Sequence, residues 1–114
     1  MIIKKFQTER GDIPFDDWIN RIDVRAQIRV ARCLDRIERG NFGDHKGVGQ
    51  GVTELRVDYG PGYRVYFGRD GKEIVVLLGG GTKRGQHADI EQAQRNWKRY
   101  KQEKRHARRA IQDK

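Results

Sequence analysis

The sequence contains few residues of the kinds that cross-link a chain or bind metal. Its one cysteine, Cys33, cannot form an internal disulfide, and its three histidines, His45, His87 and His106, are scattered along the chain. A protein metal site needs several such ligands at close spacing. We therefore expect no metal site, no cofactor and no internal disulfide.

Long apolar runs are also missing. No stretch approaches the roughly 18 apolar residues that span a membrane. The opening "MIIKKFQTERGD" has too short an apolar run for a signal peptide. The sequence therefore predicts a cytoplasmic protein, and its length suits a single domain with one modest core.

Acidic residues are scarce relative to basic ones. The 114 residues include 25 Lys or Arg against 16 Asp or Glu, which gives a formal net charge of +9. Such an excess favours a polyanionic partner. Nucleic acid is the first expectation, and an anionic membrane or an acidic protein is the next.

The first third of the chain predicts one strand and two helices. "MIIKKFQT" has the character of a short strand, and "GDIPFDDWINRI" begins a helix with Asp12 as N-cap and Pro14 in the first turn. A second helix runs through "VRAQIRVARCLDRIERG" and stops at Gly40. We expect this helix to bury Val24, Ile28, Ala31, Leu34 and Ile37, and to carry on its opposite side Arg25, Arg29, Arg32 and Arg36.

Three strands and a long helix are predicted next. The runs "GVTELRV", "GYRVYFGR" and "KEIVVLL", separated by glycine turns, predict an antiparallel meander. The unbroken apolar "IVVLL" is typical of a central strand that is covered on both faces. A last helix is expected to begin near Gln86, with Ile90, Ala93 and Trp97 on its early apolar face.

Two arginines are expected to meet across the first hairpin of this meander. The alternation of side chains sets a register in which Arg56 lies opposite Arg64, and Glu54 lies opposite Tyr66. Like charges in that position destabilise a hairpin by up to about 1 kcal/mol. Either an anion binds between the arginines, or the diagonal Glu54 neutralises Arg64 and solvent screens the rest.

Further cations follow the last strand of the meander. Its end, "GGGTKRG", brings Lys83 and Arg84 close to the same sheet. Together with the two arginines they make four cations, and with Tyr66 and Glu54 they predict a phosphate site. On this interpretation Glu54, Tyr66 and Arg84 contact RNA.

The C-terminal segment is the most one-sided in charge. From Arg95 to Arg109 there are eight Lys or Arg residues and one acidic residue. This pattern predicts a basic helix lying along nucleic acid, with a solubilising tail as the alternative. The expected RNA contacts in this segment are Lys98, Arg99, Lys101 and Arg105.

Three motifs occur in an order that resembles a known family. They are "RGNFGDHKGVGQGVTELRVDYGPGYRVYF", "IVVLLGGGTKRGQHADIEQA" and "NWKRY". The chain resembles the RelE/HigB-like toxins of type II toxin–antitoxin modules, in particular the addiction module killer protein branch of the RelE/ParE superfamily. The resemblance implies an α+β, RelE-like fold in which an N-terminal strand and helix pair pack on a small, mainly antiparallel sheet, with a C-terminal helix. Residues 1–100 are then the toxin domain, and residues 101–114 are a basic helical extension or tail.

The resemblance also implies an activity and partners. The best understood members of the family enter the ribosomal A site and cut mRNA, and a co-encoded antitoxin holds them inactive. The expected partners are therefore an antitoxin, the ribosome and mRNA, with no membrane and no small-molecule cofactor.

The basic residues of the family's site have counterparts in this chain. Arg56 and Arg64 match the basic residues of the family's second and third strands, and Lys83 or Arg84 matches the one after the last strand. In such a toxin the RNA 2′-hydroxyl attacks its own 3′-phosphate and leaves a cyclic phosphate. The cations would stabilise the extra negative charge of the phosphorane, usually the largest contribution to catalysis.

The residue for proton transfer departs from the family pattern. Some relatives carry a tyrosine where this chain has Ile90. His87 is the imidazole expected near the cations, so the resemblance makes it the catalytic acid or base, with Glu54 or Tyr66 as substitute.

Two other functions fit the same residues. One is a non-enzymatic, ParE-like toxin that binds DNA gyrase, and the other is a plain basic module that binds nucleic acid without nuclease activity. If the strand arginines act on RNA from an exposed polar face, Arg64→Ala is expected to abolish toxicity and leave folding nearly unchanged.

Overall fold

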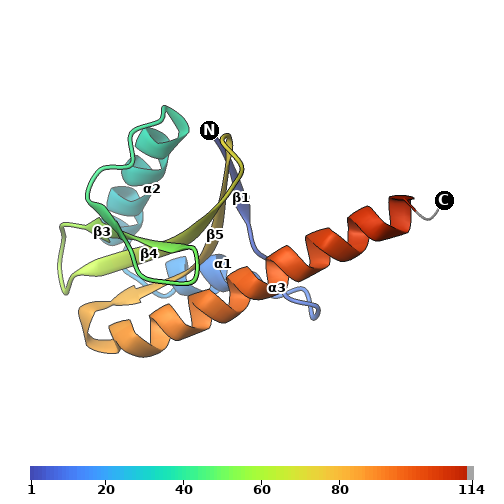
Figure 1. Ribbon diagram of the computed structural model, residues 1–114. Helices are drawn as coiled ribbons and strands as arrows, with labels where there is room; N and C mark the ends of the chain where they lie inside the picture. The colour runs from blue at the N-terminus through green and yellow to red at the C-terminus, as the bar shows by residue number, and fades with distance from the viewer. Residues whose placement is uncertain (113–114) are drawn as a thin grey trace.

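The computed structural model describes residues 1–112, which form an α+β structure around one mixed sheet (Figure 1). A short 3₁₀ turn, η1, links the last strand to the last helix. The elements in chain order are β1 (Ile2–Lys5), α1 (Pro14–Ile19), α2 (Val24–Glu38), β2 (His45–Gly47), β3 (Val52–Val57), β4 (Tyr63–Asp70), β5 (Ile74–Thr82), η1 (Lys83–Gly85) and α3 (Gln86–Gln112).

The sheet has five strands in the order β1-β5-β4-β3-β2. Strands β2 to β5 pair antiparallel, which confirms the predicted meander, and β1 pairs parallel to β5. β5 lies between β1 and β4, and its residues Val75 to Leu78 are buried, as expected for a central strand. β2 was not predicted, because its three residues are all exposed and carry no apolar alternation.

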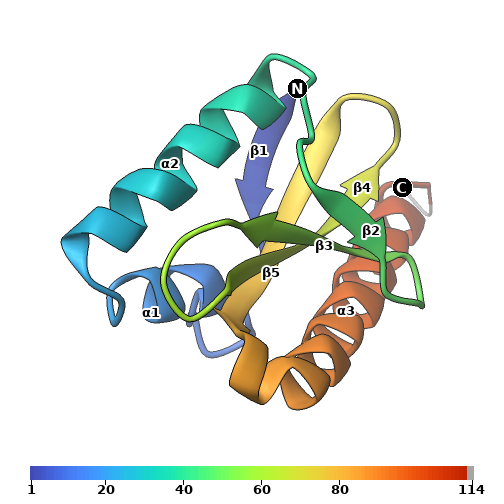
Figure 2. The same ribbon diagram turned by 90° about the vertical axis from the view of Figure 1, so that its left-hand side faces the viewer.

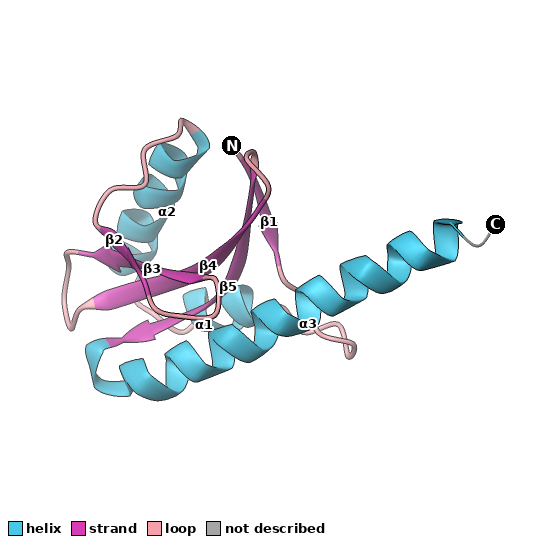
Figure 3. Cartoon of the chain, viewed as in Figure 1, coloured by secondary structure: helices cyan, strands magenta, loops and turns pink. Residues whose placement is uncertain are grey.

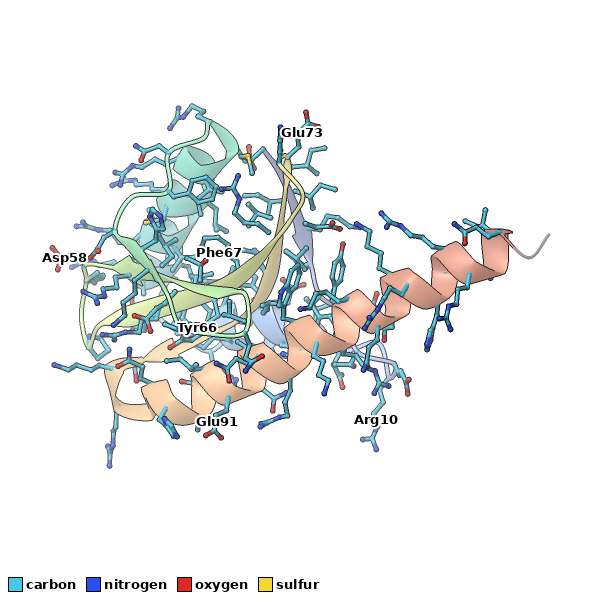
Figure 4. All side chains as sticks on the ribbon, in the orientation of Figure 1. Arg10, Asp58, Tyr66, Phe67, Glu73 and Glu91 are labelled. Atoms are coloured by element: carbon cyan, nitrogen blue, oxygen red, sulfur yellow. The ribbon has the colours of Figure 1, made fainter. Side chains whose placement is uncertain are left out.

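Helices cover both faces of the sheet, so the molecule has three layers (Figures 2 and 3). α1 and α2 pack on one face, in a cluster that includes Trp18, Val30 and Phe67. α3 packs on the other face, in a cluster that includes Tyr66 and Trp97. Figure 4 shows Tyr66 and Phe67, neighbours in β4, on opposite sides of the sheet.

Two glycines in the central strands allow this close packing. A Cβ atom at Gly80 would collide with the ring of Trp18 from α1. A Cβ atom at Gly68 would lie 2.5 Å from the ring of Trp97 from α3. The two tryptophans therefore rest directly on the sheet backbone, one on each face.

Helix starts differ in part from the prediction. Asp12 does not cap α1: the N-cap is Ile13, without a side-chain hydrogen bond. Asp12 instead closes the preceding loop, where its backbone N–H donates to the Thr8 hydroxyl. Asp23 is the residue that caps a helix, because its carboxylate accepts a hydrogen bond from the Ala26 N–H of α2 at 2.8 Å.

The buried face of α2 is rotated from the predicted one. Ala26, Val30 and Ile37 are buried, whereas Val24 and Ile28 are 67% and 47% exposed. The predicted exposure of the α2 arginines is confirmed. The prediction is confirmed for Ile37, and Leu34 packs partly buried against the same cluster, but it is wrong for Val24, Ile28 and Ala31. Apolar residues occur on both sides of this helix, so their spacing alone could not decide which side meets the sheet.

α3 is one continuous helix that extends beyond the body of the molecule (Figure 1). Ala93 and Trp97 are buried in its first half, as predicted. The helix continues without a break from residue 100 to residue 101, where the predicted extension begins. The last two residues of that extension, 113–114, lie outside the described residues. Among residues 1–112, no helix is long and apolar enough to cross a membrane.

Candidate functional site

The predicted arginine pair is present on the face of the sheet that α3 covers. In the β3–β4 ladder Arg56 lies opposite Arg64, and Glu54 lies opposite Tyr66. The predicted register is therefore confirmed, including the direct opposition of the two guanidinium side chains.

A buried carboxylate lies between the two arginines. Glu54 Oε1 is 3.4 Å from Arg64 Nε and 3.5 Å from Arg56 Nε, and the Glu54 side chain has no exposed surface. The Arg64 side chain is 11% exposed and the Arg56 side chain is 43% exposed. Glu54 thus offsets the repulsion between the arginines, and Arg56 remains open to solvent.

The first residue of α3 donates a hydrogen bond to this carboxylate. Gln86 Nε2 donates a hydrogen bond of 2.8 Å to Glu54 Oε2. The bond joins the start of α3 to the middle of β3, and it supplies a donor to a carboxylate that water cannot reach. Sequence reasoning missed Gln86, because nothing in its spacing marks it as a partner of Glu54.

Tyr66 lies fully buried beside the same carboxylate. Its hydroxyl has no hydrogen-bond partner among the described residues. Burial first, and then the negative charge of Glu54, raises the pKa of Tyr66 well above its ordinary value. The hydroxyl therefore stays protonated at physiological pH.

The expected exposure of Glu54 and Tyr66 is wrong. Both were expected to contact RNA from a polar sheet face, but both have 0% exposed surface. The reason is α3, which covers this face of the sheet with Ala93 and Trp97. The expectation that Arg64→Ala leaves folding nearly unchanged is therefore revised. Arg64 pairs with the buried carboxylate of Glu54, so removing the arginine is expected to destabilise the fold.

Lys83 lies close to Arg64 at the end of β5. A Cβ atom at Gly62 would lie 3.1 Å from Arg64 Nη1 and 3.5 Å from the Cβ of Lys83. Arg64 Nη1 also donates a 2.7 Å hydrogen bond to the Gly62 carbonyl, so the turn orients the guanidinium. We call Arg56, Arg64 and Lys83 the cation cluster; Arg84, the next residue in η1, is exposed beside Lys83.

His87 makes its contact elsewhere. Its side chain is 92% exposed, and Nε2 is 2.9 Å from Glu91 Oε1 on the same helix. Its ion-pair partner among residues 1–112 is Glu91, not Glu54. The reason is helical geometry: successive residues turn by about 100°, so His87 points away from the side on which Gln86 meets Glu54.

A second carboxyl group, which sequence reasoning also missed, lies over the strand next to Arg64. Asp89 lies over Gly81, and a Cβ atom there would collide with its carboxylate. Gly81 is the ladder partner of Arg64. Burial raises the pKa of Asp89, and nearby Arg21 offsets part of that rise. Gln86 and Asp89 are three residues apart, so they lie on one face of α3, but this spacing alone does not show that the face meets the cluster.

The four predicted RNA contacts of α3 divide between two sides of the helix. Lys98, Lys101 and Arg105 line one open groove of about 530 Å³, which also includes Gln50. Arg99 lies apart from them, because it pairs with Glu9 of the N-terminal loop and with Glu103.

The fold and site define a small α+β protein with a cation cluster at the edge of a helix-covered sheet face. Residues 17–112 match the family described as "Phage derived protein Gp49-like (DUF891)". The chain therefore belongs to the Gp49-like phage-derived protein family, which is related to toxin–antitoxin modules. It is also 43% identical over 82 residues to a Haemophilus influenzae protein described as uncharacterized, an alignment that covers 71% of this chain and 83% of that protein.

Proposed function

We propose that the chain is the toxin of a type II toxin–antitoxin module, of the RelE/HigB-like kind, and that it cuts mRNA on the ribosome. The observation that carries this proposal is the cation cluster. Arg56 and Arg64 are directly opposed across a ladder, with Lys83 near Arg64. The family's relation to toxin–antitoxin modules supports the same proposal.

The cation cluster suits a phosphate that gains negative charge during reaction. In the proposed cleavage, the RNA 2′-hydroxyl attacks the adjacent phosphorus, the bond to the 5′-oxygen breaks, and a cyclic phosphate remains. Arg56 and Lys83 are exposed enough to contact the phosphate oxygens. Arginine can hold two phosphate oxygens at once, and fixed cations stabilise the phosphorane.

Cleavage also needs one proton removed from the 2′-hydroxyl and one given to the leaving 5′-oxygen. We propose Asp89 for one of these transfers, because it lies over the ladder partner of Arg64 and burial raises its pKa. A raised pKa makes a carboxyl group better suited to acid–base catalysis. His87, exposed and paired with Glu91, stays the sequence-based alternative.

The basic side of α3 is proposed to contact ribosomal RNA or mRNA. Lys98, Lys101 and Arg105 share one groove along the helix, and phosphate contacts of this kind position a protein without reading sequence. In this proposal residues 1–100 carry the reaction, and residues 101–114 extend the contact. Arg84, exposed in η1, adds a further phosphate contact.

Inducible expression tests the proposal. Protein, RNA and DNA synthesis are followed by pulse labelling, and mRNA 5′ ends are mapped at the same times. The expected result is an early stop of protein synthesis with new 5′ ends inside translated codons. Intact mRNA during growth arrest contradicts the endonuclease. No growth arrest at all contradicts a toxin and leaves the plain nucleic-acid-binding module.

One observation favours a second function, binding of DNA gyrase without catalysis. The proton-transfer residues expected from the sequence are either fully buried, as Glu54 and Tyr66 are, or paired outside the cluster, as His87 is. If DNA synthesis stops first and mRNA stays intact, this non-enzymatic function replaces the nuclease.

A further inference from the structure

A second surface, on the α2 side of the molecule, combines exposed apolar and basic side chains. Val24 and Ile28 of α2 are 67% and 47% exposed. They are four residues apart, so they lie on one face of the helix about one turn from each other. Large aliphatic side chains exposed together mark a surface that gains from being covered.

Arginines surround these two apolar residues. Arg25, Arg29 and Arg32 are exposed, and none of them has an ion-pair partner among residues 1–112. With Ile28 and Tyr59 they line an open hollow of about 340 Å³. We call Val24, Arg25, Ile28, Arg29 and Arg32 the α2 strip.

Tyr59 fixes the orientation of one of these arginines. The guanidinium carbon of Arg29 lies 5.3 Å from the centre of the Tyr59 ring. A cation held over an aromatic face is partly ordered before any partner binds, which lowers the entropy lost on binding. The hollow therefore presents an oriented cation next to an aliphatic surface.

The chemistry of the α2 strip selects among partners. A second copy of this chain would bring its own arginines against these arginines, and like charges oppose that contact. RNA phosphates would satisfy the arginines but gain nothing from covering Val24 and Ile28. An acidic, amphipathic peptide segment satisfies both, because its carboxylates meet the arginines and its apolar residues cover the aliphatic side chains.

We propose that the α2 strip docks an acidic amphipathic segment of the antitoxin. This inference rests on the proposed toxin function, and it adds the surface to which the antitoxin binds. α2 covers the sheet face opposite the one that carries Glu54 and the cation cluster (Figure 2). The antitoxin is therefore anchored on the α2 side of the sheet, with Tyr59 of the β3–β4 turn at the edge of its binding surface.

Binding of the protein encoded by the adjacent gene, the expected antitoxin, tests the inference. The full chain carries Arg56→Ala in every sample, so that it can be produced without its proposed activity. Affinity is measured by calorimetry for this background and for Ile28→Asp, Arg29→Glu and the control Lys72→Glu, which changes an exposed cation in the β4–β5 turn. Thermal unfolding checks that each variant folds.

The expected result distinguishes specific binding at the α2 strip from a general effect of removing positive charge. Ile28→Asp and Arg29→Glu each weaken binding by about tenfold or more, since both remove a complementary contact, and Lys72→Glu has little effect. Added salt reduces the effect of Arg29→Glu, because it screens exposed charges. Folding is unchanged, since both side chains are exposed.

Three results would overturn the inference, and they differ in whether the proposed toxin function survives. Equal binding by all variants moves the antitoxin to another surface and leaves the toxin function intact. A loss with Arg29→Glu but not Ile28→Asp, with matching loss of binding to an RNA oligonucleotide, makes the strip an RNA contact. If the adjacent gene's product binds neither the Arg56→Ala background nor any variant, and does not relieve growth arrest caused by the original chain, the proposed function fails as well.

Discussion

The two faces of the sheet are packed with different kinds of residue. The face under α1 and α2 buries apolar side chains such as Leu55, Val65 and Phe67. The face under α3 also has an apolar part, but it buries Glu54 and most of Arg64 beside it. Buried charges contribute little net stability even when they are paired. This part of the α3 face is therefore expected to stabilise the fold less than the apolar face under α1 and α2.

This difference suits a sheet face that does more than hold the fold together. An apolar replacement of a buried ion pair is often neutral or stabilising. The presence of Glu54, Arg64 and a protonated Tyr66 in a covered layer therefore favours a role other than folding. Variants that change one face at a time can test this reading.

The largest expected effect is that of Arg64→Ala. It leaves the buried carboxylate of Glu54 with Arg56 and Gln86 alone. Removing one partner of a buried pair lowers the free energy of unfolding by about 3–5 kcal/mol. Urea unfolding measures this loss. The matched control is Arg56→Ala, at an exposed position, where the expected loss is below about 1 kcal/mol; equal stability of the two variants would contradict the buried pair.

A double replacement sharpens the comparison. Glu54→Leu combined with Arg64→Met makes the α3 face apolar and is expected to restore stability to within about 1 kcal/mol of the original chain, or above it. Growth arrest on induction is expected to be lost. A double variant that is stable and still toxic would mean that the buried pair has no part in the activity.

A large effect on activity with little effect on folding is expected at Asp89. Asp89→Asn keeps the size of the side chain but removes its ability to exchange a proton. Loss of general acid–base help lowers the rate by about 10²-fold or more. Appearance of cleaved mRNA ends after induction measures the rate, with His87→Ala as the control expected to change it little. A reversed ranking of the two variants would return the proton transfer to His87.

The smallest effect is expected at the far end of the contact between α3 and the sheet. Asp70 accepts hydrogen bonds from Lys104 and from Tyr100, and these lower its pKa. Because the folded-state pKa is lowered, the stabilisation is complete above the ordinary Asp pKa of about 3.9 and is lost as pH falls through the folded-state value. Asp70→Asn is expected to lower stability by roughly 1 kcal/mol at pH 7.

Unfolding curves at several pH values test this prediction. The difference between the original chain and Asp70→Asn is expected to shrink below about pH 4, as Asp70 itself becomes protonated. The control is Asp58→Asn, an exposed position labelled in Figure 4, where no such difference is expected. If the stability difference between the original chain and Asp70→Asn stayed the same in acid, the hydrogen bonds from Tyr100 and Lys104 would not depend on the charge of Asp70.

Features that depend on local alternation could be predicted from the sequence. The register that opposes Arg56 to Arg64 follows from the period of two in each strand, and the glycine turn between the strands leaves little freedom to shift it. The apolar face of α3 followed in the same way from Ala93 and Trp97. These patterns need no knowledge of what lies across from them.

Features that depend on distant packing could not be predicted. Glu54 and Tyr66 alternate as solvent-facing residues should, and only the return of α3, some 20 to 40 residues later in the chain, buries them. The choice of face on α2 depends in the same way on the sheet beneath it. The positions of Gln86 and Asp89 over the cluster follow from where η1 ends, which no local spacing encodes.

The proposed function requires that the cation cluster acts on RNA and that its exposed member Arg56 is not needed for folding. Mapping of mRNA 5′ ends in cells that express the original chain, Arg56→Ala or Lys72→Ala at equal protein levels tests it most directly. We expect new ends within translated codons for the original chain and for Lys72→Ala, and none for Arg56→Ala. Identical sets of ends in all three samples would contradict it.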